Sequence, residues 1–229
     1  VTLGATPKDR ELIRLRDENS RLGAELAAIH RQTLVDDEVR KILKVLGDRE
    51  PKVPAWVTHT PPQKSDMEVP VAIWSNCHGG EVVSKDEVSG ANEYNMAIMR
   101  ARVRKLVERT IHLTDRPHAT YPGIVLTLLG DFISGAPHPA LMTPDDSTTI
   151  GATLALRDIL VWAISIVADK YGRVYLPCTA GNHGRNTMKP EFKRYVYKNF
   201  DWMLYKLLER YFENDKRVEF DIRPSNEVF

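Results

Sequence analysis

Three stretches of the chain each begin with apolar residues and end on polar ones. They cover residues 71–79, 126–131 and 174–183, and their apolar parts are rich in β-branched and aliphatic side chains. Short runs of this kind are typical of buried parallel strands, whose carboxyl ends meet at one edge of a sheet. A further strand-like run lies at residues 217–222. The pattern therefore predicts an α/β fold with a mixed sheet, helices outside it, and one site where the strands end.

Apolar residues at helical spacing predict helices over residues 92–113, 153–170 and 191–212. The first of these helices also carries a set of basic residues: Arg100, Arg102, Arg104, Lys105 and Arg109. They form either a phosphate-facing surface or a solvated helix face, and the second interpretation is favoured because charge runs usually face solvent. The aromatic residues of the last helix either stack on bases or pack in the core, and their helical spacing favours the core.

The amino-terminal part of the chain has a different pattern. Residues 8–33 carry apolar side chains at alternating spacings of three and four, which predicts a helix with a coiled-coil-like seam. Self-association through this helix is the favoured interpretation, and a single amphipathic helix lying on the domain is the alternative. Residues 51–70 contain five prolines and no regular period, as in a linker. The sequence thus divides into a helical oligomerisation segment (1–48), a proline-rich linker (49–68) and a catalytic domain (69–229).

Composition narrows the choice of partners and compartment. The chain has 229 residues, and its 32 Lys and Arg against 31 Asp and Glu leave a net charge of +1. A nucleic-acid partner therefore needs a local basic patch or bound metal ions. Cys77 and Cys178 form no disulfide framework and no zinc-binding spacing, which favours buried thiols and a reducing compartment such as the cytoplasm. The longest apolar stretch, residues 159–168, is too short to span a bilayer, so no membrane partner is expected.

The polar ends of the three stretches carry the candidate chemistry. They present Asn76 and His78 after the first stretch, Asp131 after the second, and Asn182 with His183 after the third. Carboxylate, amide and imidazole groups that converge at a sheet edge suit a divalent metal ion. The alternative is that these are ordinary turn residues, since Asp and Asn favour such positions. Three such groups in order, each behind a strand, favour a site.

These motifs also carry a family resemblance over about residues 69–222. The motifs are Asn76-x-His78, Gly130-Asp131 and Gly181-Asn182-His183. Their order resembles that of the calcineurin-like metallophosphoesterases, whose pattern runs Asp-x-His, Gly-Asp, Gly-Asn-His. The resemblance implies an αββα sandwich, of which this chain supplies mainly the first sheet. It also implies two divalent metal ions, manganese in preference to iron, zinc or magnesium.

The resemblance assigns a role to each residue of the motifs. Asp131 is implied to bridge the two ions, His78 and position 76 to bind the first ion, and Asn182 to bind the second through its amide oxygen. His183 is implied to contact the phosphate and protonate the leaving oxygen, as the catalytic histidine. Arg185 is a candidate phosphate clamp by its position alone.

His138 is a further substrate-binding candidate. It lies in the long irregular segment of residues 132–149, and segments of this length inside a compact domain are usually functional or mobile. A lone loop histidine is more often simply solvated, and this reading is favoured over a contact with the site.

Two departures from the family pattern affect the expected activity. The family has an aspartate where this chain has Asn76, and no histidine follows His183, whereas the family supplies later histidines. We therefore expect a chain truncated after Phe229, with a natural or engineered change at position 76. A neutral amide binds a hard cation less well than a carboxylate, so the chain as written is expected to be nearly inactive.

The expected substrate follows from the finer resemblance. The motifs are similar to those of phage-encoded DNA-repair exonucleases and phosphoesterases, which implies a phosphodiesterase or nuclease acting on DNA in the host cytoplasm. A small-molecule phosphatase is the alternative within the same class. A catalytically dead binding or assembly module is the alternative from another class, and it is supported by Asn76, the missing histidines and the amino-terminal helix.

Overall fold

The computed structural model describes residues 52–58, 67–117, 119–135, 148–187 and 195–223, together with Glu18 and Arg21. The chain divides into two compact units, Val1–Asp48 and Arg49–Phe229, and the fold below is that of the second. The predicted coiled-coil seam, most of the proline-rich linker and His138 lie outside the described residues. Self-association through residues 8–33 therefore stays a prediction.

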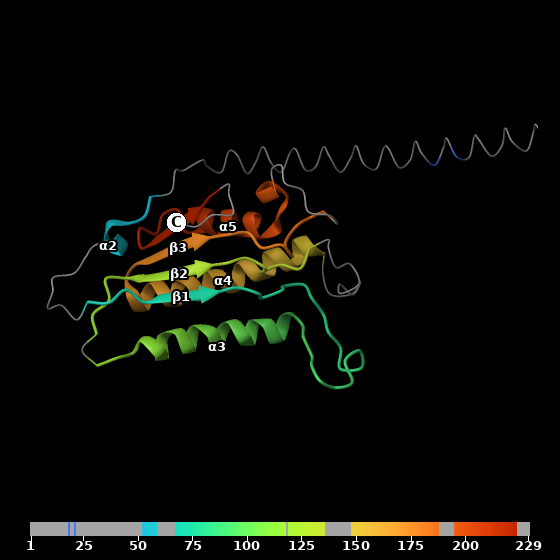
Figure 1. Ribbon diagram of the computed structural model, residues 1–229, viewed down its shortest axis with the longest axis horizontal. Helices are drawn as coiled ribbons and strands as arrows, with labels where there is room; N and C mark the ends of the chain where they lie inside the picture. The colour runs from blue at the N-terminus through green and yellow to red at the C-terminus, as the bar shows by residue number, and fades with distance from the viewer. Residues whose placement is uncertain are drawn as a thin grey trace, which may run out of the picture. The chain divides into compact units, whose positions relative to one another are not determined.

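Four parallel strands form the sheet at the centre of this unit (Figure 1). They are β1 (Val71–Trp74), β2 (Ile124–Leu128), β3 (Val174–Cys178) and β4 (Val218–Ile222), and they lie side by side in chain order. Every pairing between them is parallel, so the prediction of a mixed sheet was wrong for the described residues. The carboxyl ends of all four strands consequently lie at one edge of the sheet.

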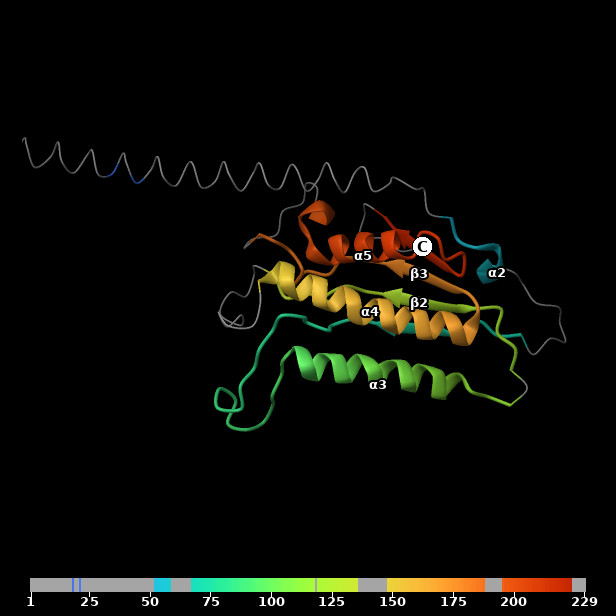
Figure 2. The ribbon, with the colours of Figure 1, turned by 180° about the vertical axis from the view of Figure 1, so that it is seen from behind.

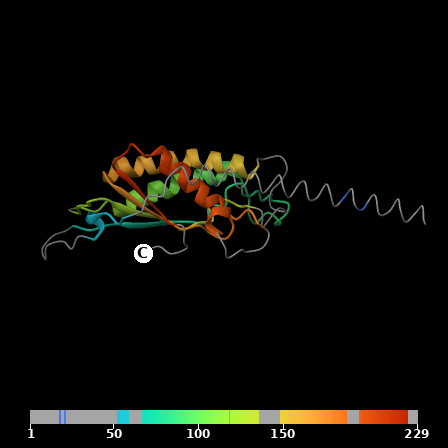
Figure 3. The ribbon, with the colours of Figure 1, turned by 90° about the horizontal axis from the view of Figure 1, so that it is seen from above.

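Helices cover one face of this sheet. They are α3 (Met96–Thr114), α4 (Thr149–Tyr171) and α5 (Phe200–Tyr211), while α2 (Ala55–Thr58) and the 3-10 helix η2 (Tyr195–Lys198) are short. Helix α4 packs against both α3 and α5, and Figures 2 and 3 show all three on the same side of the strands. The described residues thus form two layers of an α/β fold, and a second sheet facing the first remains a prediction.

Capping residues set the helix boundaries. The Asn95 side chain accepts the N–H of Ile98 at 3.0 Å and begins α3, and Gly172, with a φ of 73°, ends α4 as its position in the sequence predicted. The single helix predicted over residues 191–212 was wrong. Asn199 has an extended backbone and accepts the N–H of Asp201 at 2.8 Å, so α5 begins after it and η2 stands apart.

The core lies between the sheet and the helix layer. Leu126, Leu128 and Leu176 of the strands are fully buried against the helices, and Trp202 and Tyr205 of α5 are buried as well. The preference for core packing over base stacking in the last helix is therefore confirmed for these two aromatic side chains. On the opposite face of the edge strand β1, Val71 and Ile73 are more than 60% exposed.

Helix α4 corrects the expectation about membrane-spanning length. It runs for 23 residues with a mean hydropathy of 1.8 in its most apolar window, so by length and composition it is able to cross a membrane. Core helices pass the same test, and α4 packs on β3 and between α3 and α5. This packing buries 44% of the apolar window and leaves Ile150, Leu154 and Trp162 exposed.

Candidate active site

Backbone hydrogen bonds tie together the loops that follow β1, β2 and β3. The N–H of Asn76 donates to the carbonyl of Gly130 at 3.2 Å, and that of His78 donates to the carbonyl of Asp131 at 3.0 Å. The third loop joins through the N–H of Gly135, which donates to the carbonyl of His183 at 2.9 Å. The three motifs, far apart in sequence, are therefore adjacent at the carboxyl edge of the sheet.

Three of the predicted site residues come into direct contact. The Asp131 carboxylate accepts the backbone N–H of His183 through Oδ1 at 2.7 Å, which fixes its orientation. The imidazole rings of His78 and His183 meet edge to face with 4.7 Å between their centroids. His78, Asp131 and His183 thus form one cluster, to which β1, β2 and β3 each contribute one residue.

The two predicted asparagine ligands lie beside this cluster. Asn76 is exposed, and its Nδ2 donates to Ser75 Oγ at 2.8 Å. Asn182 is exposed on the same turn as His183. Both positions are at the carboxyl edge, although the Asn76 amide is hydrogen-bonded to its neighbour.

The backbone at these motifs is in an unusual conformation. Asn76, His78 and Asp131 have φ values of 55°, 48° and 55°, in the left-handed region that side chains seldom adopt. Among the described non-glycine residues only Ser89 shares this feature. Asn, Asp and His tolerate the region better than other residues, yet each such residue costs about 1 kcal/mol. Strain gathered at three neighbouring positions is typical of a functional site.

Two glycines allow the loops to approach each other. A Cβ on Gly130 would lie 2.1 Å from the backbone nitrogen of Gly181, and a Cβ on Gly181 would lie 2.1 Å from Asp131 Oδ1. Gly130 also has a φ of 78°, which favours glycine. The glycines of both motifs are therefore required by close packing of the two turns.

Arg185 contacts the backbone of its own turn. Its Nη1 donates to the carbonyl of Asn182 at 3.0 Å, and its Nε donates to the carbonyl of Thr187 at 3.1 Å. These bonds brace the turn that carries Asn182 and His183. The role of Arg185 as a phosphate clamp stays a prediction, as does any contact made by His138.

Asp201 is a positioning residue that the sequence analysis missed. This side chain is fully buried at the start of α5, and its carboxylate accepts four backbone N–H groups at 2.9 to 3.1 Å. The donors are Asp131, Phe132, Ile133 and Gly181. One carboxylate therefore holds the loops after β2 and β3 together from below. An acidic residue in the first turn of a helix reads as ordinary dipole compensation, so the sequence gives no stronger signal.

Burial makes the Asp201 carboxyl an unusually weak acid. Desolvation raises its pKa from 3.8 to about 6, against the backbone N–H donors, which favour the charged form. Between about pH 4 and pH 6 the folded chain binds more protons than the unfolded chain. The free energy of unfolding should therefore fall as the pH rises through this window, by up to about 3 kcal/mol from this group. Urea unfolding at several pH values, compared between the chain and Asp201→Asn, checks this, and equal pH slopes would contradict it.

Glu81 and Ser134 lie beside His78, and the sequence analysis did not identify either of them. Ser134 Oγ lies 3.3 Å from His78 Nδ1 and donates to Glu81 Oε2 at 3.4 Å, and the same carboxylate oxygen is 3.7 Å from the imidazole nitrogen. A carboxylate and a hydroxyl beside one ring nitrogen fix the orientation of the imidazole. Glu81 follows Gly80 in a polar stretch that the sequence analysis had no reason to place here.

The interpretation of the two thiols as buried is confirmed for Cys178, whereas Cys77 is of intermediate exposure. Desolvation raises the pKa of Cys77 to about 12, and it raises the pKa of the Cys178 thiol well above its usual range. A raised pKa keeps a thiol protonated near neutral pH, so neither cysteine is primed to act as a nucleophile.

The donor types at the site fit a divalent cation. Asp131 offers a carboxylate, His78 an imidazole, and Asn76 and Asn182 offer amide oxygens, while Glu81 adds a second carboxylate beside His78. In the described ranges, no three His, Cys, Asp or Glu side chains are grouped closely enough to hold a metal ion. Asn76 and Asn182 are not among these four residue types, so the amide ligands come in addition.

The chain was compared with known proteins at three levels. No family model, no curated protein and no solved structure gives a significant match.

Proposed function

We propose that this chain is a metal-dependent phosphoester hydrolase of the phosphodiesterase or nuclease type, acting on DNA, with its activity held very low by Asn76. The proposal includes an αββα sandwich to which the parallel sheet contributes one of two sheets. The described residues form an α/β fold with one four-stranded parallel sheet, and the second sheet is part of the proposal.

One observation carries this proposal. His78, Asp131 and His183 meet at the carboxyl edge of the sheet, each on the loop after a different strand, and His78 and Asp131 have left-handed backbone conformations. The shared edge of parallel strands brings such loops together, but it does not by itself require this strain. The cluster combines a carboxylate with two imidazoles, which suits the hydrolysis of an anionic ester.

Each residue has a task in this chemistry. Asp131 and His78 would hold the cations, with Asn182 beside them through its amide oxygen. Divalent ions held by these residues would supply neutralisation of the phosphate oxygens and activation of a water molecule near neutral pH. The His183 imidazole contacts the phosphate and gives a proton to the leaving oxygen. Asp201 and Glu81 touch no substrate, and they position the loops and His78.

Replacing Asn76 by aspartate tests the proposal. The change adds a carboxylate at the point where the β1 loop meets Gly130, so we expect manganese affinity to rise at least about tenfold. Hydrolysis of a bis-aryl phosphodiester and of linear DNA should rise with it. Isothermal titration with manganese and turnover assays on the chain and on Asn76→Asp measure both effects.

Two control variants make the result specific. Asn214→Asp adds the same charge at an exposed position before β4, at the opposite edge of the sheet, and should change neither quantity. Asp131→Asn in the Asn76→Asp background should abolish the gain. If Asn76→Asp binds manganese no better than Asn214→Asp does, the hydrolase proposal is wrong and a non-catalytic binding module is favoured.

A further inference from the structure

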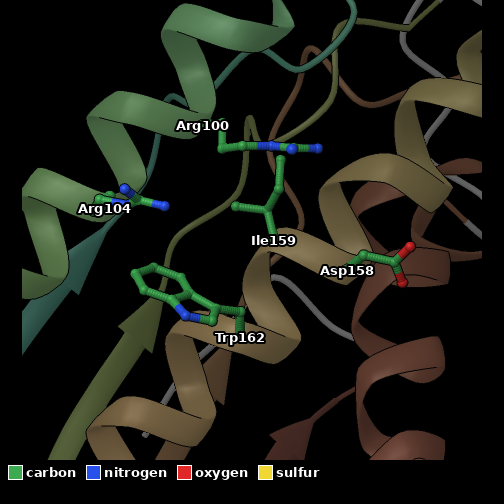
Figure 4. A pocket seen from close by; sticks show the side chains of 5 residues that line it. All are labelled: Arg100, Arg104, Asp158, Ile159 and Trp162. Atoms are coloured by element: carbon green, nitrogen blue, oxygen red, sulfur yellow. The ribbon is translucent and has the colours of Figure 1, made fainter.

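A groove between α3 and α4 combines positive charge with an exposed aromatic ring. Its volume is about 280 Å³, and its lining is Arg100, Arg104, Asp158, Ile159 and Trp162 (Figure 4). Ile159 is buried and forms an apolar floor, while Trp162 is 41% exposed. The guanidinium of Arg104 lies over the Trp162 ring at 5.7 Å from its centroid. The Trp162 ring therefore already contacts one cation, and the exposed part of the ring is open to a stacking ligand.

The charges in the groove favour an anion. Arg100 and Arg104 are one helical turn apart on α3, and both are exposed. Asp158 is the only acidic residue of the lining, and it forms an ion pair with Arg157 at 3.0 Å. Figure 4 shows the Asp158 carboxylate pointing away from Trp162. The side of the groove that carries Trp162 is consequently positive, although the whole chain has a net charge of only +1.

We propose that this groove binds a single strand of nucleic acid, with one base stacked on Trp162 and the adjoining phosphates on Arg100 and Arg104. Stacking on an aromatic side chain tolerates any base, and arginine supplies both charge and hydrogen bonds to phosphate. An apolar partner would leave two guanidinium groups desolvated, so charge complementarity selects the polyanion. The volume is slightly below that of typical small-molecule pockets, which suits one nucleotide unit of a longer chain.

The groove and the candidate active site share helix α4. The loop after β1 packs on the first half of this helix, since a Cβ on Gly80 would lie 3.0 Å from the Cβ of Ala152. Trp162 follows Ala152 by ten residues, which corresponds to about 15 Å along the helix. A strand whose end lies at His78 and Asp131 can therefore reach the groove within a few nucleotides. This inference rests on the proposed function for the identity of the polymer.

Binding of a fluorescein-labelled oligothymidylate, followed by anisotropy in the presence of a chelator, tests the groove without hydrolysis. The double variant Arg100→Ala/Arg104→Ala should weaken binding and flatten the dependence of log K on log salt by about 1.4, or about 0.7 for each lost phosphate contact. Trp162→Leu should weaken binding about tenfold and leave the salt dependence nearly unchanged, because it removes the stacking surface and the ring under Arg104 but no charge. Asp158→Asn should strengthen binding slightly.

Arg109→Ala is the matched control, because Arg109 is exposed on the same helix and does not line the groove. If this control weakens binding as much as the double variant, or if the chain does not bind the oligonucleotide, the inference is wrong. If thymidine monophosphate competes as well as the oligonucleotide at the same concentration, the groove binds a free nucleotide and the proposal of a nucleic-acid strand is wrong. Failure of the proposed hydrolase is a separate result, because it appears in the manganese and turnover assays of Asn76→Asp.

Circular dichroism of each variant separates loss of binding from loss of folding. Trp162 is the most exposed tryptophan of the chain, since Trp74 and Trp202 are buried and Trp56 is half-buried. Stacking should therefore quench the exposed part of the tryptophan fluorescence in the intact chain and not in Trp162→Leu. Equal quenching in both would contradict a base on Trp162.

Discussion

Replacing Asp201 by asparagine should lower the free energy of unfolding by about 3 kcal/mol and separate the loops that carry the candidate site. Each carboxylate oxygen accepts two backbone N–H groups: Oδ1 accepts the buried ones of Phe132 and Ile133, and Oδ2 the partly buried ones of Asp131 and Gly181. An amide has a single acceptor oxygen, so in either orientation its NH2 group faces two N–H donors. Two buried or partly buried donors then lose their partners in either orientation of the amide.

Thermal and urea unfolding measure the stability side of this prediction. A loss of about 3 kcal/mol corresponds to a fall in Tm of about 6 to 12 °C for a domain of this size. Asp169→Asn is the matched control, because it makes the same chemical change at an exposed carboxylate that pairs with Arg217 at 2.7 Å. That surface pair should contribute little to stability, because solvent screens it. Equal losses in the two variants would show that Asp201 does not hold the loops.

The separation of the loops has its own measurement. In Asp201→Asn, the amides of Asp131 and Gly181 should exchange their hydrogens with solvent much faster than in the unchanged chain, because they lose a buried acceptor. The amide of Leu160, a fully buried residue in the middle of α4, should keep its protection relative to the stability of the whole domain. Uniform acceleration across both sites would instead indicate global destabilisation alone.

The strands of the sheet were predictable because each one is marked by its own run of apolar residues. Buried parallel strands need continuous apolar runs, and β2 and β3 are short blocks of such residues that end at a glycine motif. Placing the polar ends side by side needed only the rule that parallel strands share a carboxyl edge. The contact between Asp131 and His183 followed from that rule.

The rest of the site depends on one long-range contact and on two local turns that the apolar pattern does not encode. Asp201 acts on Asp131 from 70 positions away, and its sequence neighbours are those of any helix start. Glu81 reaches His78 only because the loop after β1 turns back at Gly79 and Gly80. The break at Asn199 was missed because the apolar period continues on both sides of it, while a hydrogen bond to Asp201 sets the boundary.

Replacing Gly181 by alanine should severely damage the candidate site itself. Its Cβ would lie 2.1 Å from Asp131 Oδ1 and 2.3 Å from the Asp131 backbone nitrogen. That nitrogen is part of the loop held by Asp201, so the two turns must move apart. The bond between His183 and the Asp131 carboxylate would break with them. Overpacking of this kind should cost about 2 to 4 kcal/mol.

Gly172→Ala separates this steric effect from the general cost of losing a glycine. Gly172 has a φ of 73° with no atom within 4 Å of an added Cβ, so only the left-handed backbone opposes the change, at about 1 to 2 kcal/mol. Unfolding of both variants, together with manganese titration in the Asn76→Asp background, gives the comparison. Gly181→Ala should lose the manganese affinity gained through aspartate at position 76, whereas Gly172→Ala should keep it. Retention of that affinity in Gly181→Ala would mean that the contact between the β2 and β3 turns does not set the orientation of Asp131.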